Sequence, residues 1–250
     1  MSVWELVLLF AAGIGGGLVG SIAGLASVST YPALLLVGLP PVTANVTNTV
    51  ALVFNGVGSV AGSLPELRGR RAELMRLVPV GLAGGAAGAA LLLSIPGEGF
   101  ENAVPILLAC SAVVIALPHR KDAEQPPPSR RRNVVVAVAL FAICVYGGFF
   151  GAAAGLLMLA LFLRTGAASL AEANATKNVV LGTANAVAAL IFVVLSPVVW
   201  TAMAPMAVGC LIGARLGPIV VRHAPATPLR LLIAAAALGL AIKLGLDTYR

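Results

Sequence analysis

The sequence predicts an all-α polytopic membrane protein built from two inverted structural repeats, with about eight to ten membrane segments. Three observations predict this fold. Hydrophobic residues make up 60% of the 250 residues and charged residues only 10%, whereas soluble proteins carry roughly 25% charged residues. The charges fall in short clusters between long uncharged runs, a pattern typical of membrane spans. Finally, three sequence blocks of the first half recur in the second half.

The composition excludes several functions. The net charge of +7 does not indicate nucleic-acid binding, because the basic residues form no continuous face. No enzyme is expected, because the few acidic residues lie almost wholly in loops and make no acid–base pair. Cys110, Cys144 and Cys210 lie in apolar runs at unrelated spacings, and His119 and His223 lie in predicted loops. We therefore expect no metal or cofactor, and cysteines that pack as small hydrophobic groups.

Proline and glycine separate most of the apolar segments. These segments are expected at 3–38, 43–65, 74–95, 101–118, 133–163, 171–196, 198–221 and 227–247. No cleavable signal peptide is expected, since the first five residues contain no Lys or Arg. The chain divides into a first membrane repeat (1–118), a cytoplasmic linker (119–132) and a second membrane repeat (133–250).

Lys and Arg in the short loops predict the orientation. The loops 66–76 and 119–132 are rich in arginine, and Arg222 and Arg230 flank the last connection, so we assign these three connections to the cytoplasm. The only charged residues of the loop 95–101 are acidic, and a loop without Lys or Arg suits the outside. Both termini are then expected outside.

Two apolar runs must begin and end on the same side of the membrane. As a single helix, the run 133–163 would be about 46 Å long, which exceeds a hydrocarbon core of about 30 Å. We therefore expect a broken element that enters and turns back near Gly151–Gly155. The same reasoning predicts a break near Gly20–Gly24 in the run 3–38. Two short spans and a re-entrant hairpin both satisfy this pattern.

The repeated blocks keep their order and nearly constant separations of 131, 129 and 128 residues. Residues 16–24 match 147–155, residues 44–50 match 173–179, and residues 80–86 match 208–214. Because the first half begins outside and the second inside, the repeats are inverted. Inverted repeats are typical of secondary transporters, whose binding site lies at the repeat interface.

Polar clusters recur in both halves within the second block. The cluster residues are Asn45, Asn48, Thr49, Asn174, Lys177 and Asn178. Their spacing places each trio on one helical face. At a helix N-terminus such a face suits an anion, because free N–H groups and the positive end of the helix dipole meet there. The alternative is helix capping and hydrogen bonding between helices.

Lys177 and Arg215 are the cations most deeply embedded in apolar sequence. Charged side chains at membrane depth usually face a cavity or a partner. No embedded carboxylate matches them, since Glu172 lies at the edge of a span, and this favours an anionic substrate. For each cation the alternative is a side chain that snorkels to the interface. Asn55 and Asn185 are further candidates, deeper along the same spans.

The glycines Gly20, Gly24, Gly151 and Gly155 are expected to line the site. Helix breaks at these positions would bring backbone N–H groups to the midplane of the membrane. The alternative is close helix packing, which also requires small residues and permits a homodimer.

The elements GGLVGSIAG and GGFFGAAAG, ANVTNTVAL and ANATKNVVL, and GCLIGARLG resemble the TauE/SafE family of sulfite exporters over nearly the whole chain. The resemblance implies export of small sulfur oxyanions or organosulfonates, such as sulfite or sulfoacetate, across the bacterial inner membrane. One position departs from symmetry: Asn48 stands where the second half has Lys177.

We therefore expect a multi-pass transporter of the bacterial inner membrane that exports a small sulfur-containing anion by alternating access. The polar cluster residues, with Arg215 as a second cation, would line its site. The membrane potential alone can drive anion export, because the interior is negative. An anion channel and a membrane scaffold or assembly subunit without a solute are the alternatives.

Overall fold

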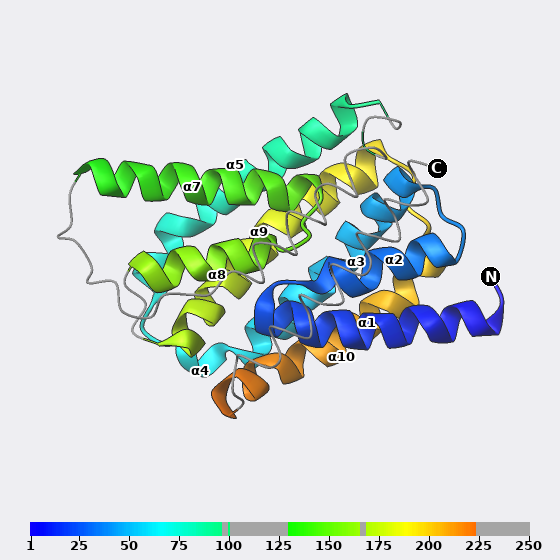
Figure 1. Ribbon diagram of the computed structural model, residues 1–250, viewed down its shortest axis with the longest axis horizontal. Helices are drawn as coiled ribbons and strands as arrows, with labels where there is room; N and C mark the ends of the chain where they lie inside the picture. Colours follow the sequence, from blue (N-terminus) through cyan, green and yellow to red (C-terminus); the bar gives the residue numbers. More distant parts are fainter. Residues whose placement is uncertain (97–99, 101–129, 166–168, 224–250) are drawn as a thin grey trace, which may run out of the picture.

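A computed structural model describes residues 1–96, 100, 130–165 and 169–223, and this part of the chain is all-helical (Figure 1). Its helices are α1 (Val3–Ala23), α2 (Ala26–Leu36), α3 (Pro41–Gly62), α4 (Leu64–Leu67), α5 (Arg71–Ser94), α7 (Arg130–Phe149), α8 (Ala154–Thr165), α9 (Leu170–Leu195) and α10 (Trp200–His223). The predicted segments 101–118 and 227–247, and most of the 119–132 linker, lie outside the described residues.

Five of the described helices are long and apolar enough to cross a membrane, namely α1, α5, α7, α9 and α10, while α2 and α8 are shorter apolar helices. Large hydrophobic side chains on the outer surface are exposed, for example Val194 and Leu195 near the end of α9. Such an apolar exterior is suited to lipid. The expected multi-pass membrane fold is thus confirmed, whereas the expected total of segments includes stretches outside the described residues.

Both predicted helix breaks occur at the predicted glycines. α1 ends at Ala23, and Gly24 follows with a φ of 72°, its N–H donating to the carbonyl oxygen of Gly20 at 2.7 Å. This left-handed cap is a common helix end, and it favours glycine. α7 ends at Phe149 and is followed by Gly151 with a φ of 77°. In each half a long helix is therefore followed by a short one.

The short helix of each pair folds back on the long one. α2 packs on α1, and α8 packs on α7. In Figure 1, α1 runs inward from the N-terminal end of the bundle and α2 returns to that end, while α7 and α8 do the same from the opposite end. Each broken run therefore begins and ends on one side, as the charge pattern predicts.

The most extensive helix contacts join the two halves of the chain. α1 packs mainly on α10, α7 packs mainly on α5, and α3 crosses α9. Glycines make these contacts close: a Cβ atom on Gly17 would meet the backbone of Cys210, and one on Gly88 would meet the backbone of Val145. Small residues that let backbones approach are typical of membrane helix interfaces.

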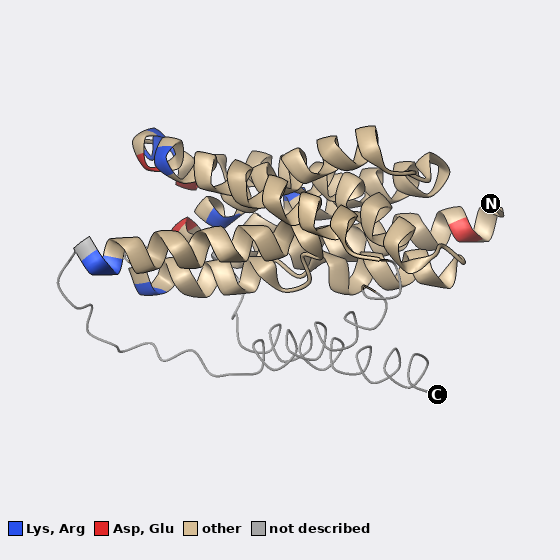
Figure 2. Ribbon diagram, turned by 90° about the horizontal axis from the view of Figure 1, so that it is seen from above, with Lys and Arg blue, Asp and Glu red and all other residues tan. Residues whose placement is uncertain are grey.

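Most Lys and Arg residues of the described part lie at the end of the bundle opposite the N-terminus (Figure 2). At that end Arg70 pairs with Glu73 at 2.8 Å and with Glu172 at 3.7 Å. The second ion pair connects the start of α5 to the start of α9, and so joins the two halves.

Candidate functional site

The two helix breaks lie directly against each other. A Cβ atom built on Gly24 would overlap the backbone of Gly155, and one built on Gly155 would overlap Gly24. Only glycine therefore fits at either position. The contact places the C-terminal end of α1 beside the N-terminal end of α8, at the centre of the described bundle.

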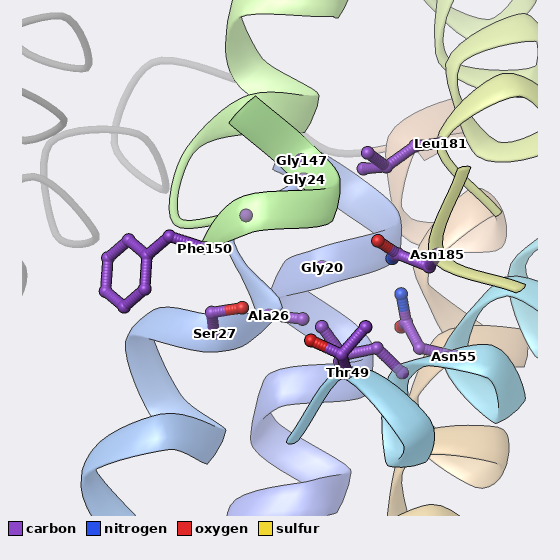
Figure 3. A pocket seen from close by; sticks show the side chains of 12 residues that line it. Gly20, Gly24, Ala26, Ser27, Thr49, Asn55, Gly147, Phe150, Leu181 and Asn185 are labelled. Carbon is purple, nitrogen blue, oxygen red and sulfur yellow. The ribbon is translucent and has the colours of Figure 1, made fainter. Parts of the chain in front are cut away.

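A pocket opens beside this contact, with walls from both halves (Figure 3). Its cavity volume is about 20 Å³, the room of about one water molecule. The residues that line it are Gly20, Gly24, Ala26, Ser27, Thr49, Leu52, Asn55, Gly147, Phe150, Gly151, Leu181 and Asn185. Of the predicted site residues, Thr49 and the glycines Gly20, Gly24 and Gly151 line this pocket.

Two asparagines face each other across the pocket. The carboxamides of Asn55 and Asn185 point toward one another in Figure 3, one from α3 and one from α9. Asn185 is only 6% exposed, and no hydrogen bond joins its carboxamide to the described residues. The Oδ1 atom of Asn55 is buried and likewise has no partner in the described part of the chain. Buried amides without partners are uncommon, and here they are directed at a polar space.

Asn45 contacts the other half of the molecule. Its Nδ2 donates to the carbonyl oxygen of Phe149 at 2.8 Å, at the end of α7. The last carbonyls of a helix have no partner within that helix, so Asn45 caps α7. Thr49 donates to the carbonyl oxygen of Asn45 at 2.9 Å, within α3.

Asn48 binds α2, the short helix that follows the first break. Its Nδ2 donates to the hydroxyl of Ser27 at 3.1 Å, and its Oδ1 accepts from the hydroxyl of Thr30. Both partners are on α2. The bonds fix the N-terminal turn of α2 against α3, next to the pocket.

Lys177 is fully buried, so the snorkelling alternative is wrong for this residue. Its Nζ donates to the carbonyl oxygens of Gly20 and Ser21, at 3.1 and 3.2 Å, in the last turn of α1. The ammonium group thereby meets the negative end of the α1 dipole. Lys177 thus caps α1 from the second half, as Asn45 caps α7 from the first.

The remaining predicted residues have different surroundings. Asn178 donates to the hydroxyl of Ser63 at 3.1 Å, and the Oδ1 of buried Asn174 has no partner in the described part of the chain. Arg215 does not join the cluster: its side chain is exposed, while its backbone packs against α3. Its exposure agrees with the snorkelling alternative.

The chemistry of the pocket suits an anion. Ala26 and Ser27 open α2, and no side chain caps this helix end, so its free N–H groups and positive dipole end face the pocket. Sequence reasoning missed Ser27, although Ser27, Ser29 and Thr30 interrupt an apolar run and the spacing of Ser27 and Thr30 places them on one helical face. No group of three or more His, Cys, Asp or Glu residues among the described ones could hold a metal ion.

Fold and pocket together define a polytopic helical membrane protein with a polar pocket between two broken helices. The chain belongs to the sulfite exporter TauE/SafE family, whose sequence profile matches residues 9–244. This family consists of membrane transporters, which confirms the prediction that the protein is not an enzyme.

Several relatives are probable membrane transporter proteins. YfcA of Escherichia coli strain K12 is 28% identical over 215 residues, which cover 85% of this chain and 79% of YfcA. ORF9 of a Sinorhizobium species is 28% identical over 246 residues, covering 97% of this chain and 93% of that protein. A relative from Haemophilus influenzae is 30% identical over 217 residues, covering 85% and 83%. No solved structure matches the chain.

Proposed function

We propose that the protein is a secondary transporter that exports a small sulfur-containing anion, sulfite or an organosulfonate such as sulfoacetate, across the bacterial inner membrane. The observation that carries this proposal is the pocket at the contact of the two broken helices. It is lined by both halves, faces the positive end of α2, and contains no carboxylate among its described lining residues. The family name supports the sulfur oxyanion.

Inverted repeats over 1–118 and 133–250, joined by the linker 119–132, account for the packing. If α1, α3 and α5 correspond to α7, α9 and α10, the contact of α1 with α10 has its counterpart in that of α7 with α5. The contact of α3 with α9 then lies on the symmetry axis. A site on this axis suits alternating access, because both halves form its walls.

The basic end of the bundle is cytoplasmic in this proposal, and both termini are outside. Support comes from the arginines of the loop 66–76 and of the start of α7, which lie at one end of the molecule (Figure 2). Short loops rich in Lys and Arg remain in the cytoplasm.

The predicted polar residues have two roles in this mechanism. Thr49 faces the pocket, while Asn45, Asn48, Asn178 and Lys177 hold the surrounding helix ends in place. Lys177 also supplies the positive charge behind the pocket. Arg215 has no part in the site, because its side chain is exposed.

Thermal unfolding of the detergent-purified protein tests the substrate class. The panel is sulfite, sulfoacetate, taurine, sulfate, phosphate and chloride. A ligand at about 100 times its Kd stabilises the native state by roughly 2.7 kcal/mol. We expect stabilisation by sulfite or a sulfonate, loss of this response in Lys177→Ala, and saturable flux of the same anion in proteoliposomes. Absence of any anion response and flux would refute the proposal, and steady passive conductance would identify a channel.

A further inference from the structure

The polar groups that line the pocket are all uncharged. They are the hydroxyls of Ser27 and Thr49, the carboxamides of Asn55 and Asn185, and the free N–H groups at the start of α2. None of the lining residues in the described part of the chain is acidic or basic. The charge of a ligand must therefore be balanced by a group that does not itself line the pocket.

A basic side chain, that of Lys177, lies directly behind the pocket wall. The Nζ of Lys177 is 3.1 Å from the carbonyl oxygen of Gly20, and Gly20 itself lines the pocket. The side chain of Lys177 is fully buried, so water does not screen its charge. A ligand with one negative charge has a matching partner here. A second negative charge on the ligand would be removed from water without a matching positive charge, which is strongly unfavourable.

We propose that the pocket binds singly charged oxyanions, with Asn55 and Asn185 donating hydrogen bonds from the two halves. Hydrogensulfite and monosulfonates match the single charge of Lys177, whereas sulfite as a dianion, sulfate and sulfoacetate carry one charge too many. The inference therefore removes sulfoacetate from the substrates proposed above. The nine-tenths buried and unpartnered carboxamide of Asn185 is the independent sign that a ligand completes the site. This inference rests on the proposed function and narrows its substrate class.

Methanesulfonate and sulfate test the charge selection, because they differ in charge and in one group at sulfur, a methyl group against an oxygen. Both are tetrahedral at sulfur and expose oxygen atoms, and neither changes its charge near neutral pH, but methanesulfonate carries one negative charge and sulfate two. Binding of each is measured by calorimetry and by thermal stabilisation of the full-length purified protein. We expect a Kd for methanesulfonate at least tenfold lower than that for sulfate.

Variants of the two asparagines test the location of the site. Asn55→Ala and Asn185→Ala should each weaken methanesulfonate binding at least tenfold. Asn185→Asp, which keeps the size of the side chain, should also lose binding, because its carboxylate repels the anion. Thr183→Val is the matched control on α9: its hydroxyl bonds to the carbonyl oxygen of Val180 at 2.8 Å, outside the pocket.

The outcomes separate this inference from the proposed function. Sulfate binding as tight as methanesulfonate binding overturns the charge selection. Unchanged methanesulfonate affinity in folded Asn55→Ala and Asn185→Asp overturns the site, while transport by the wild-type protein would leave the proposed function standing. A wild-type protein that binds and transports none of these anions overturns both.

Discussion

Lys177 keeps its ammonium group away from water, held by two carbonyl oxygens of α1. The described residues offer it no carboxylate partner. Removing such a charge from water costs several kcal/mol, and two neutral acceptors recover only part of this. An apolar side chain of similar length would serve helix packing better, which supports the role in binding proposed above for Lys177.

Substitution by methionine separates the two roles of Lys177. We expect Lys177→Met to melt at the same temperature as the wild-type protein or higher, because removal of the desolvated charge offsets the two lost hydrogen bonds. The stabilisation by sulfite or methanesulfonate should disappear. Thermal unfolding with and without anion measures both effects. A variant that melts lower yet keeps its anion response would assign Lys177 to structure alone.

Asn45 should be important for stability, because its loss leaves a buried carbonyl oxygen of Phe149 without a donor. We expect Asn45→Ala to destabilise the protein by about 1–3 kcal/mol. Thr176→Val is the control, because the hydroxyl of Thr176 bonds only within its own helix, to Glu172. Thermal unfolding compares the two, and equal losses would argue against capping of α7 by Asn45.

The buried polar residues could be predicted from sequence, but their partners could not. Amides and a lysine within apolar runs at helical spacing indicate buried polar contacts, and Asn45, Asn48 and Lys177 are indeed buried. The capping alternative describes Asn45 and Lys177 well. Their partners lie 104 and 157 residues away in sequence, on helix ends that exist only after two other runs break. Local pattern contains no information about such pairs.

At the scale of elements, the breaks between α1 and α2 and between α7 and α8 depend on backbone geometry. Run length and loop charge were enough to predict that both runs fold back. The unequal lengths of the two helices in each pair and the contact between the two breaks could not be predicted. They depend on tertiary packing of Gly24 against Gly155.

Two glycines with similar backbone geometry give a matched test of this contact. Gly24 and Gly38 both have positive φ, 72° and 84°, but only Gly24 has a backbone against it. Gly38→Ala should cost about 1–2 kcal/mol, the strain of the left-handed conformation. Gly24→Ala should cost clearly more and abolish transport, because its methyl group separates the two breaks. Comparable thermal stability and flux in both variants would contradict a tight contact.

At the scale of the whole molecule, the proposed orientation predicts which residues are reachable from outside the cell. Pro40 precedes α3 and Ala72 lies at the start of α5, so they mark opposite ends of α3, and both are exposed. In a variant without native cysteines, Pro40→Cys should react with a membrane-impermeant maleimide on intact cells. Ala72→Cys should react only after lysis. The reverse pattern would invert the topology.

Packing between the halves predicts that neither half is stable alone. α1 has its main partner in α10, and α7 has its main partner in α5. Residues 1–118 and 133–250 expressed separately should therefore be degraded, whereas co-expression should restore both fragments and anion binding. Fragment levels on immunoblots measure this. A half that accumulates by itself would be inconsistent with helices that depend on the other half.

The cross-packing of α1 on α10 has a consequence for motion. Backbones in contact at Gly13, Gly17, Gly209 and Gly213 leave no room for α1 to slide independently of α10. α3 packs on the same α10, and it also packs on α9, where a Cβ atom on Gly56 would meet the backbone of Gly182. α1 and α10 therefore move together, although they belong to different halves of the sequence.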